Sequence, residues 1–451
     1  MNCTLLLIIG LLIVFNNQAT ENANVNRESV WRSNFQSFTQ CKDNLLDQGF
    51  LEYDLELRLW PDNRPNVINN IPSLLCHGFG ASATTMTEYA RVNSPDRIPG
   101  DVFTFCFKDK PNNSGTFVFH SSFGQAGDVK SCLMALRVVY ECCYINSNNI
   151  SIIGCNLFGQ SRGAGTIVNV LSVLNTDTNY WDFALDDIKQ LFDQDMRNNI
   201  LCMIKKGVVV LDAPMVSVKA GFDAHVHEIF RGLFFEKIIS CIGHDYILPL
   251  ITWGKYSPSG MQALTSVDNL PKGLKVLVSY QKNDAAVGNL YDKVFAEKLI
   301  KQLSHKNVWV ILASDGDKNF NKETWKILQQ ADQEGKIHRR WFIGLPYCAI
   351  PAHNAGFITL LCSGILNAFF KKHNGSYFNN KKQLDCADNI LNEVQKELES
   401  SAENYFVQKH YIEYGGKSMP VVQPNYTLLL LCVIGLISTG LASFKFILLF
   451  A

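Results

Sequence analysis

The chain has 451 residues, a formal net charge of +0 and an apolar fraction of 47%. This apolar fraction is ordinary for a globular protein and excludes disorder as the default state. The neutral balance, with no cluster of lysine and arginine, excludes nucleic acid as the expected partner. The length suffices for one large hydrophobic core or two modest ones.

The amino-terminal end predicts export from the cytoplasm. Leu5–Phe15 is an apolar run of eleven residues, and it is followed by the polar stretch Asn16–Thr20. That length fits the core of a signal peptide better than a membrane span. We therefore assign residues 1–20 to a signal peptide with cleavage near Ala19 or Ala23, although no lysine or arginine precedes the run.

Predicted strands and helices alternate from about Leu51 to Leu366. The predicted strands are Leu51–Leu59, Ile71–Cys76, Val102–Phe107, Ile152–Phe158, Val208–Leu211, Leu274–Tyr280, Val308–Ala313 and Trp341–Leu345. The predicted helices between them are Asp128–Tyr140, Ala164–Leu174, Lys322–Glu334 and, after the last strand, Phe357–Phe369. Short apolar runs separated by helices predict a mainly parallel, doubly wound α/β sheet that is buried on both faces. We assign this domain to residues 45–370.

The strand pattern stops between Pro214 and Pro271, where the chain is apolar, rich in aromatic residues and typical of helices. We interpret residues 215–270 as a helical cap over the carboxyl edge of the sheet. An ordinary pair of packing helices is the alternative. A smaller acidic insertion at Asp177–Asn199 has no role that the sequence assigns.

The pentapeptide Gly159-Gln160-Ser161-Arg162-Gly163 joins a predicted strand to a predicted helix. A serine at so tight a turn sits in strained backbone with its hydroxyl exposed, and flanking glycines leave room for the chain to double back. The G-x-S-x-G pattern by itself is weak, because ordinary glycine and serine usage produces it by chance. The strand before it and the helix after it favour a nucleophile elbow with Ser161 as the nucleophile.

A glycine-containing turn follows the predicted strand Ile71–Cys76 and has the sequence His77-Gly78-Phe79-Gly80. Small residues at such a turn let main-chain N–H groups point into a site and hold an oxyanion. The N–H groups of Phe79 and of Arg162 are therefore the candidate donors. A simple glycine turn is the alternative interpretation, and we expect His77 to be structural.

The orienting acid and the general base must lie in loops at the carboxyl edge of the sheet, near the serine. Asp284 lies just beyond the predicted strand Leu274–Tyr280, where an orienting acid belongs. A turn aspartate is the alternative for Asp284. Asp315 and Asp317, after the next strand, are the competing acids, whereas Asp212 stands beside a proline and indicates a structural turn.

His353 lies on the loop between the last predicted strand and the final apolar helix, from which a histidine can reach over the sheet edge. We assign it as the general base. The competing histidines are His244 in the predicted cap and His305 and His338 among charged neighbours. Some forty residues separate the Val308 strand from His353, and the predicted helix Lys322–Glu334 fills part of them.

These residues resemble the α/β-hydrolase family. Ser161, Asp284 and His353 stand in that family's chain order of serine, acid and histidine, and the His77-Gly78 pair precedes the elbow as it does there. The resemblance covers about Leu51 to Leu366. It implies a serine nucleophile, a covalent acyl-enzyme and a cap inserted before the strand that carries the acid. The residues around the serine are similar to both esterase and peptidase elbows.

The carboxyl-terminal end predicts attachment to a membrane. Residues 371–424 are polar and are assigned to a helix and a stalk, and residues 426–451 are assigned to a tail. Leu428–Phe444 is a run of seventeen apolar or small residues, the lower limit for a spanning helix. The tail is either a membrane anchor or a removable GPI signal, and Lys445 is awkward for both.

The fourteen cysteines include Cys76, Cys106 and Cys155 in predicted central strands, where a cysteine is more often a buried apolar residue than a disulfide partner. If the chain is exported, we expect a few disulfides, with no pairing assigned. No pair of cysteines has zinc spacing. We expect no metal and no cofactor.

Together these patterns predict an exported, membrane-tethered serine hydrolase whose domain lies outside the cytoplasm. The substrate is a small-molecule or lipid-like ester, because the aromatic-rich cap favours an acyl group. A serine peptidase of the same fold is one alternative. A catalytically silent, hydrolase-like binding protein at the cell surface is another. The oligomeric state stays open.

Overall fold

The computed structural model describes most of residues 57–314, four residues at 341–346, most of residues 364–396, and residues 412–413. Within these ranges it leaves out residues 63, 65–66, 79–97, 108–121, 146–153, 231–235, 253, 282–286, 288–291, 343–344, 380–383, 386, 390 and 393–394. No helix among the described residues is long and apolar enough to cross a membrane. The predicted signal peptide and tail lie outside them.

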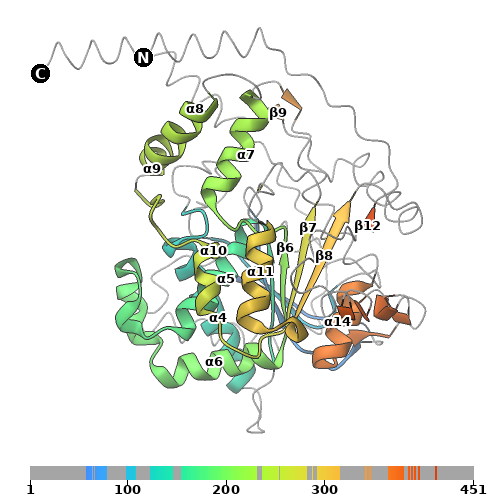
Figure 1. The fold of residues 1–451 in the computed structure, drawn as a ribbon. Coiled ribbons are helices and arrows are strands. Elements are labelled where there is room, and N and C mark those ends of the chain that lie inside the picture. The colour runs from blue at the N-terminus through green and yellow to red at the C-terminus, as the bar shows by residue number, and fades with distance from the viewer. Residues whose placement is uncertain are drawn as a thin grey trace, which may run out of the picture.

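The central element is an eight-stranded sheet in the order β1-β4-β3-β5-β6-β7-β8-β12 (Figure 1). Its strands are β1 (Leu57–Trp60), β3 (Ser73–Cys76), β4 (Val102–Phe105), β5 (Asn156–Gln160), β6 (Val209–Asp212), β7 (Val276–Gln281), β8 (Val308–Ser314) and β12 (Ile412–Glu413). Only β1 pairs antiparallel to its neighbour, and the other pairings in this sheet are parallel. The predicted mainly parallel α/β sheet is therefore confirmed.

Alternate residues of the central strands enter two separate cores, one on each face of the sheet. On β5, Leu157 belongs to one core and Phe158 to the other, and on β6 Val209 and Val210 divide in the same way. Because side chains alternate across a strand, a continuous apolar run supplies both faces. This is why the strands lack the alternating polarity of a half-exposed sheet.

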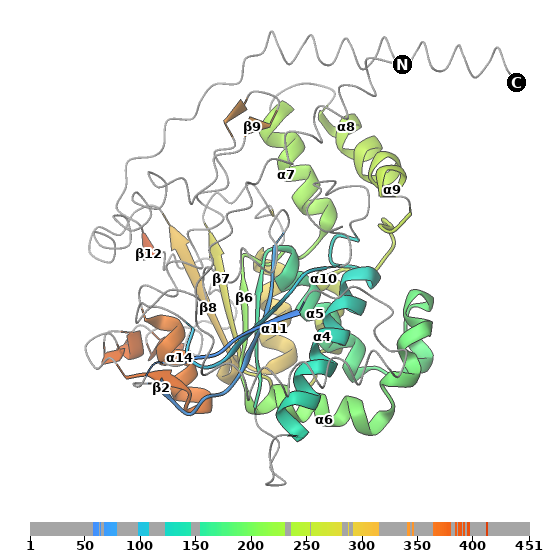
Figure 2. The same ribbon diagram turned by 180° about the vertical axis from the view of Figure 1, so that it is seen from behind.

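Helices cover both faces of the sheet (Figures 1 and 2). One face carries α4 (Ala126–Ile145), α5 (Arg162–Asn175), α6 (Gln194–Lys206) and α11 (Asp292–Leu303). The other face carries α14 (Ile365–Asn374), whose Phe369 ring meets Trp309 of β8 edge to face at 5.2 Å between centroids. The order of helices and strands places the carboxyl ends of the parallel strands, and the turn at Ser161, at one edge.

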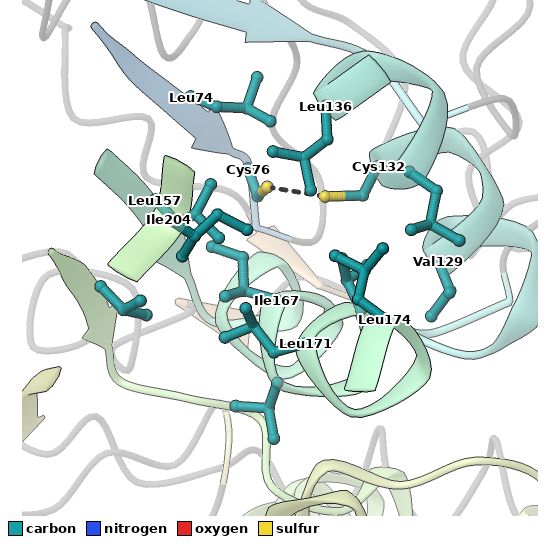
Figure 3. Close-up of a cluster of buried hydrophobic side chains, with 14 of the residues drawn as sticks. Leu74, Cys76, Val129, Cys132, Leu136, Leu157, Ile167, Leu171, Leu174 and Ile204 are labelled. Atoms are coloured by element: carbon teal, nitrogen blue, oxygen red, sulfur yellow. Dashed lines mark hydrogen bonds between the residues drawn. The ribbon is translucent and has the colours of Figure 1, made fainter. Parts of the chain in front are cut away.

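Two cysteines help to fill the larger core. Cys76 of β3 and Cys132 of α4 point toward one another among leucines, isoleucines and valines, with 3.6 Å between their sulfur atoms (Figure 3). Burial raises the pKa of the Cys76 thiol, and the neighbouring Cys132 raises it further. Cys76, Cys106 and Cys155 are all buried. In this region they act as small apolar residues, as predicted.

The acidic insertion at Asp177–Asn199 forms short helical elements. They are η1 (Thr178–Tyr180), η2 (Phe183–Leu191) and the beginning of α6. The side chains of Asp177, Asp182 and Asp193 each accept a main-chain N–H of the turn that follows. An aspartate in this position satisfies an N–H that has no partner within the helix and favours the positive end of the helix dipole. Three aspartates of the insertion therefore serve helix capping.

The segment between β6 and β7 is helical, as predicted. It contains α7 (Val218–Phe230), α8 (Glu236–Ile242), a π-helical turn (Gly243–Ile247), α9 (Leu248–Ile251), α10 (Ala263–Ser266) and η4 (Val267–Asn269). Helices α7, α8 and α9, which we call the cap helices, stand beyond the carboxyl edge of the sheet, with α7 nearest to the strands and α8 and α9 displaced toward the side that carries α5 and α10 (Figures 1 and 2). They therefore lie on the same side of the sheet as Ser161.

Two features of the carboxyl-terminal half differ from the prediction. The predicted strand Trp341–Leu345 is not part of the main sheet, because β9 (Trp341–Phe342) and β10 (Leu345–Pro346) pair only with each other. A proline has no N–H to give to a sheet, so this run is confined to an edge. The sheet instead ends with β12, which lies in the segment predicted as a stalk.

The polar segment after α14 also contributes to the core. A two-stranded pair joins β2 (Val67–Ile68) to β11 (Tyr377–Phe378), just beyond α14. The described residues from 384 to 396 are helical, and Leu384, Ala387 and Leu391 are buried in the same core as Phe369. Their spacing of three and four residues forms one apolar face within an otherwise polar sequence.

Candidate active site

Ser161 stands at a sharp turn between β5 and α5. Its backbone angles are φ 54° and ψ −118°, a conformation that a residue with a side chain rarely adopts. Such strain persists only when the surrounding structure holds it, and it is concentrated at functional sites. Ser161 precedes α5, yet its side chain makes no capping hydrogen bond to the helix. The predicted strand, turn and helix around the serine are present.

The two glycines of the pentapeptide are required by close approach. A Cβ at Gly159 would lie 2.6 Å from the backbone of Ala164, and a Cβ at Gly163 would lie 2.2 Å from the carbonyl oxygen of Cys76. Contacts this short are repulsive and involve backbone atoms that cannot move aside. The pattern G-x-S-x-G therefore follows from the space available between β5, α5 and the end of β3.

Main-chain hydrogen bonds hold the turn against the next strand. The N–H of Ser161 donates to the carbonyl oxygen of Asp212 at 2.8 Å, and the N–H of Met215 donates to the carbonyl oxygen of Ser161 at 3.1 Å. The buried carboxylate of Asp212 accepts a hydrogen bond from the hydroxyl of Ser279 on β7. Asp212 therefore connects the turn to two strands, in agreement with the structural role predicted for it.

Arg162, the residue that follows the serine, forms a buried ion pair with Asp128. The guanidinium of Arg162 donates to both carboxylate oxygens of Asp128 at 2.6 and 2.5 Å, and both side chains are about 2–3% exposed. The same carboxylate accepts the N–H of Gly124 at 2.5 Å. The guanidinium also lies 4.6 Å from the centre of the Phe107 ring, a cation–π contact. The pair fixes the start of α5 to the start of α4.

The side chain and the main chain of Arg162 therefore have different roles. Its side chain is used by Asp128, so it is the backbone N–H that is the candidate oxyanion donor. Arg162 is the first residue of α5, and the first N–H groups of a helix point along the axis at its positive end. The N–H groups of Ala164 and Gly165, two and three residues further on, are already bonded to the carbonyl oxygen of Ser161.

The turn after β3 passes beside the serine. A Cβ built at Gly78 would lie 3.2 Å from the Cβ of Ser161, so only a small residue fits there comfortably. The ring of His77 is buried, with Nδ1 at 2.8 Å from the carbonyl oxygen of Gly78 and Nε2 accepting the N–H of Phe107 at 3.3 Å. Nδ1 therefore carries the proton and the ring is neutral. His77 ties the end of β3 to the end of β4.

Phe79, Asp284 and His353 lie outside the described residues, as do the competing acids Asp315 and Asp317. The structure does describe the chain just before Phe79 and just before Asp284. Gly78 immediately precedes Phe79 and lies against Ser161. Strand β7 ends three residues before Asp284, at the sheet edge where β5 ends at the serine. With neighbouring strands about 4.8 Å apart, β7 lies about 10 Å from β5, a gap that an imidazole can bridge.

The competing histidines have other surroundings. His244 has Nδ1 at 2.5 Å from a carboxylate oxygen of Asp245 and Nε2 at 2.5 Å from the hydroxyl of Tyr256, so both ring nitrogens are engaged within the segment 215–270. Burial raises the pKa of Tyr256, which keeps its hydroxyl protonated. His305 precedes β8 and thus lies at the amino edge of the sheet, opposite to Ser161. His338 lies outside the described residues.

The ion pair of Asp128 and Arg162 is the part of the site that the sequence does not reveal. The two residues are 34 positions apart, and each has an ordinary explanation in its own segment. The one signal in the sequence is the arginine itself. It follows the serine at the start of a helix that packs on the sheet, and a buried charge without a partner is costly, so a carboxylate is expected nearby. Among the described residues, no three His, Cys, Asp or Glu side chains are grouped to hold a metal ion.

Comparisons with known proteins give solved structures of hydrolases at low similarity. The esterase Est1E of Butyrivibrio proteoclasticus with bound ferulic acid has 13% identity and a TM-score of 0.34, and the match covers 62% of this chain and 94% of that one. Esterase 2 of Thermogutta terrifontis, phosphoramylated by tabun, has 12% identity and a TM-score of 0.35, with coverage of 63% and 90%.

A proline iminopeptidase of Mycobacterium smegmatis has 10% identity and a TM-score of 0.33, with coverage of 58% of this chain and 87% of that one. No protein-family model matches the chain, and no curated protein sequence matches it. At TM-scores this low we take neither the activity nor the substrate of these proteins as evidence. The function proposed below therefore rests on the residues of this chain.

Proposed function

We propose that this chain is a serine hydrolase that cleaves carboxylic esters through an acyl-enzyme. The observation that carries the proposal is the backbone of Ser161, which is held at φ 54° between a parallel strand and a helix. Close packing at Gly159 and Gly163 and a buried ion pair hold that conformation in place. A strained serine at the carboxyl edge of a parallel sheet has the arrangement that a nucleophile needs.

In the proposed reaction the hydroxyl oxygen of Ser161 attacks the ester carbonyl carbon while His353 takes the hydroxyl proton. The tetrahedral intermediate collapses, the alcohol leaves with the proton that His353 returns, and the acyl group stays on Ser161. Water then repeats the sequence and releases the carboxylic acid. Asp284 holds the imidazole in the correct tautomer and stabilises the imidazolium.

The backbone N–H groups of Arg162 and Phe79 are proposed to stabilise the oxyanion. The position of Arg162 at the start of α5, and the passage of Gly78 beside Ser161, support this assignment. Each donor of this kind contributes about 3 kcal/mol to the transition state in enzymes where one has been removed. A backbone donor cannot be deleted by changing its side chain.

Export, attachment to a membrane and preference for a lipid-like ester are further parts of the proposal. They rest on the apolar run Leu5–Phe15, on the apolar run Leu428–Phe444 and on the aromatic composition of residues 215–270. No cofactor or metal takes part in the proposed reaction. The domain assignment is likewise proposed: residues 1–20, 45–370, 371–424 and 426–451.

The direct test is hydrolysis of p-nitrophenyl esters of increasing chain length by the purified full-length protein, beside aminoacyl p-nitroanilides. We expect release of p-nitrophenol from the esters, with a first burst equal to the enzyme present because the acyl-enzyme accumulates. Faster cleavage of the anilides would establish the peptidase alternative. Release from neither series, by a protein shown to be folded by circular dichroism, would favour the silent binding protein.

The assignment of the acid gives a second prediction. Asp284→Asn is expected to lower kcat by about 10⁴-fold, because an asparagine at this position holds the histidine in the wrong tautomer. Asp315→Asn and Asp317→Asn are the matched controls, since they make the same change after the next strand. We expect them to retain most of the activity. The reverse ranking in steady-state ester hydrolysis would move the acid to the later loop.

A further inference from the structure

Large exposed apolar side chains gather on the cap helices. Of those that the structure describes, five lie in one helical run: Ile238, Ile242, Tyr246, Ile247 and Leu250, which are 56%, 46%, 71%, 47% and 77% exposed. The others, Ile68, Tyr180 and Val294, are scattered over separate elements. Single exposed apolar residues are normal on a protein surface, whereas a group of this kind marks an interaction site. We call the five residues the cap stripe.

Four residues of the cap stripe lie along one face because of their spacing, and the fifth, Ile247, is next to Tyr246. Ile238, Ile242, Tyr246 and Leu250 follow one another at intervals of four residues through α8, the π turn and α9. At 3.6 residues per turn a spacing of four slowly drifts around a helix. The wider π turn advances less per residue and offsets that drift. The apolar side chains therefore stay together over the whole run.

The opposite face of the same run is held inside the protein. A Cβ at Gly243 would lie 2.4 Å from the ring of Phe222, so α7 packs directly on the π turn. His244 bonds to Tyr256, and Tyr256 packs edge to face on Phe123 just before α4. With one face fixed in this way, the helices cannot roll to bury the cap stripe without breaking these contacts.

The run has little charge. Besides the buried His244, residues 236–251 contain only Glu236, Lys237 and Asp245 as acidic or basic residues. A surface with isoleucine and leucine at its centre, one tyrosine and a single lysine within residues 236–251 fits an apolar or zwitterionic partner better than an acidic one. Tyrosine is enriched at membrane interfaces, because its ring is apolar and its hydroxyl can stay in water.

The course of the chain indicates what lies against the cap stripe. Strand β12 runs parallel to β8, with Glu413 paired to Ser314, so the chain leaves the sheet at its carboxyl edge. The cap helices stand beyond the same edge (Figure 1). Residues 414–427 then precede the apolar run Leu428–Phe444. These fourteen residues span at most about 50 Å when fully extended.

We propose that the cap stripe docks on the surface of a phospholipid bilayer, the one to which the carboxyl-terminal tail attaches the chain. The inference rests on the proposed membrane attachment of the tail, and it adds an orientation: the cap, and the edge of the sheet that carries Ser161, face the lipid. The substrate class that follows is an ester presented at the lipid surface. Burial of the five side chains supplies the binding energy, without a requirement for anionic lipid.

The test is photo-crosslinking in the full-length protein, reconstituted into phosphatidylcholine vesicles. Tyr246→p-benzoylphenylalanine and Leu250→p-benzoylphenylalanine place the reactive group on the cap stripe. Tyr180→p-benzoylphenylalanine is the matched control, because Tyr180 is 82% exposed and follows the end of α5 that points away from Ser161. All three positions are exposed, so the changes leave the core untouched.

We expect about tenfold more lipid adduct at Tyr246 and Leu250 than at Tyr180, because only an inserted position is in constant contact with lipid. Equal yields at the three positions, or no lipid adduct at all, would overturn the proposal. A crosslink from Leu250 to a second copy of the chain would overturn it in favour of a dimer interface. Crosslinking does not require turnover, so failure of the proposed hydrolase activity would leave this result interpretable.

Discussion

Replacing Ser161 by alanine is expected to abolish ester hydrolysis while the protein remains folded. Removal of a serine nucleophile lowers kcat by up to about 10⁶-fold in hydrolases where it has been measured. The stability is expected to change by less than about 1 kcal/mol. The elbow is fixed by main-chain bonds to Asp212 and Met215, none of which uses the serine hydroxyl. Alanine carries the same Cβ, so the strain at φ 54° is unchanged.

The measurement is steady-state hydrolysis of p-nitrophenyl butyrate, with the unfolding transition followed by circular dichroism in urea. Ser172→Ala is the matched control, because it removes a buried hydroxyl from the same helix about three turns further on. We expect Ser172→Ala to keep its activity. Full activity in Ser161→Ala would show that the turn has no catalytic role.

Loss of either partner of the Asp128–Arg162 pair is expected to destabilise the protein by about 3–5 kcal/mol, because the remaining charge is buried without its partner. Asp128→Asn and Arg162→Met are the two single changes. Both side chains are almost fully buried, and the bidentate contact joins the start of α4 to the residue that follows the nucleophile. We also expect ester turnover to fall in the fraction that stays folded, because Arg162 positions the elbow.

Two comparisons test this prediction further. The double variant Asp128→Asn with Arg162→Met leaves no lone charge, so its loss is expected to be smaller than the sum of the single losses. Lys219→Met removes one partner of an exposed pair with Asp223, and it is expected to cost less than about 1 kcal/mol. Urea unfolding measures all of them. If Asp128→Asn cost no more than Lys219→Met, the buried pair would have no structural role.

The central sheet and the elbow are predictable from the sequence because their signals are local. A strand such as Val209–Asp212, buried on both faces, is a short apolar run, and the turn at Ser161 needs glycines at fixed positions. The observed strand boundaries differ from the predicted ones by a few residues. Strand β5, for example, begins at Asn156 rather than at Ile152. Asn156 is polar yet buried, and it is retained by hydrogen bonds to Ser73 and Val208.

Other features depend on contacts between distant residues. The pairing of Asp128 with Arg162 arises from the packing of α4 on α5, which no spacing within the sequence encodes. Strand β12 is only two residues long, so it cannot show the alternation of apolar and polar residues that predicts a strand. Its position beside β8 depends on the path of the chain. Composition predicts an apolar cap, but the outward face of the cap stripe becomes visible only when the π turn and its buried side are known.

The most direct test of the central claim is covalent labelling of the full-length protein by a fluorophosphonate probe, followed by peptide mapping. The probe reacts with an activated serine and not with an ordinary one. We predict a label on the peptide that contains Ser161, and no label in Ser161→Ala or in heat-denatured protein. A label on a different serine, or a folded protein that does not react, would contradict the assignment of Ser161 as the nucleophile.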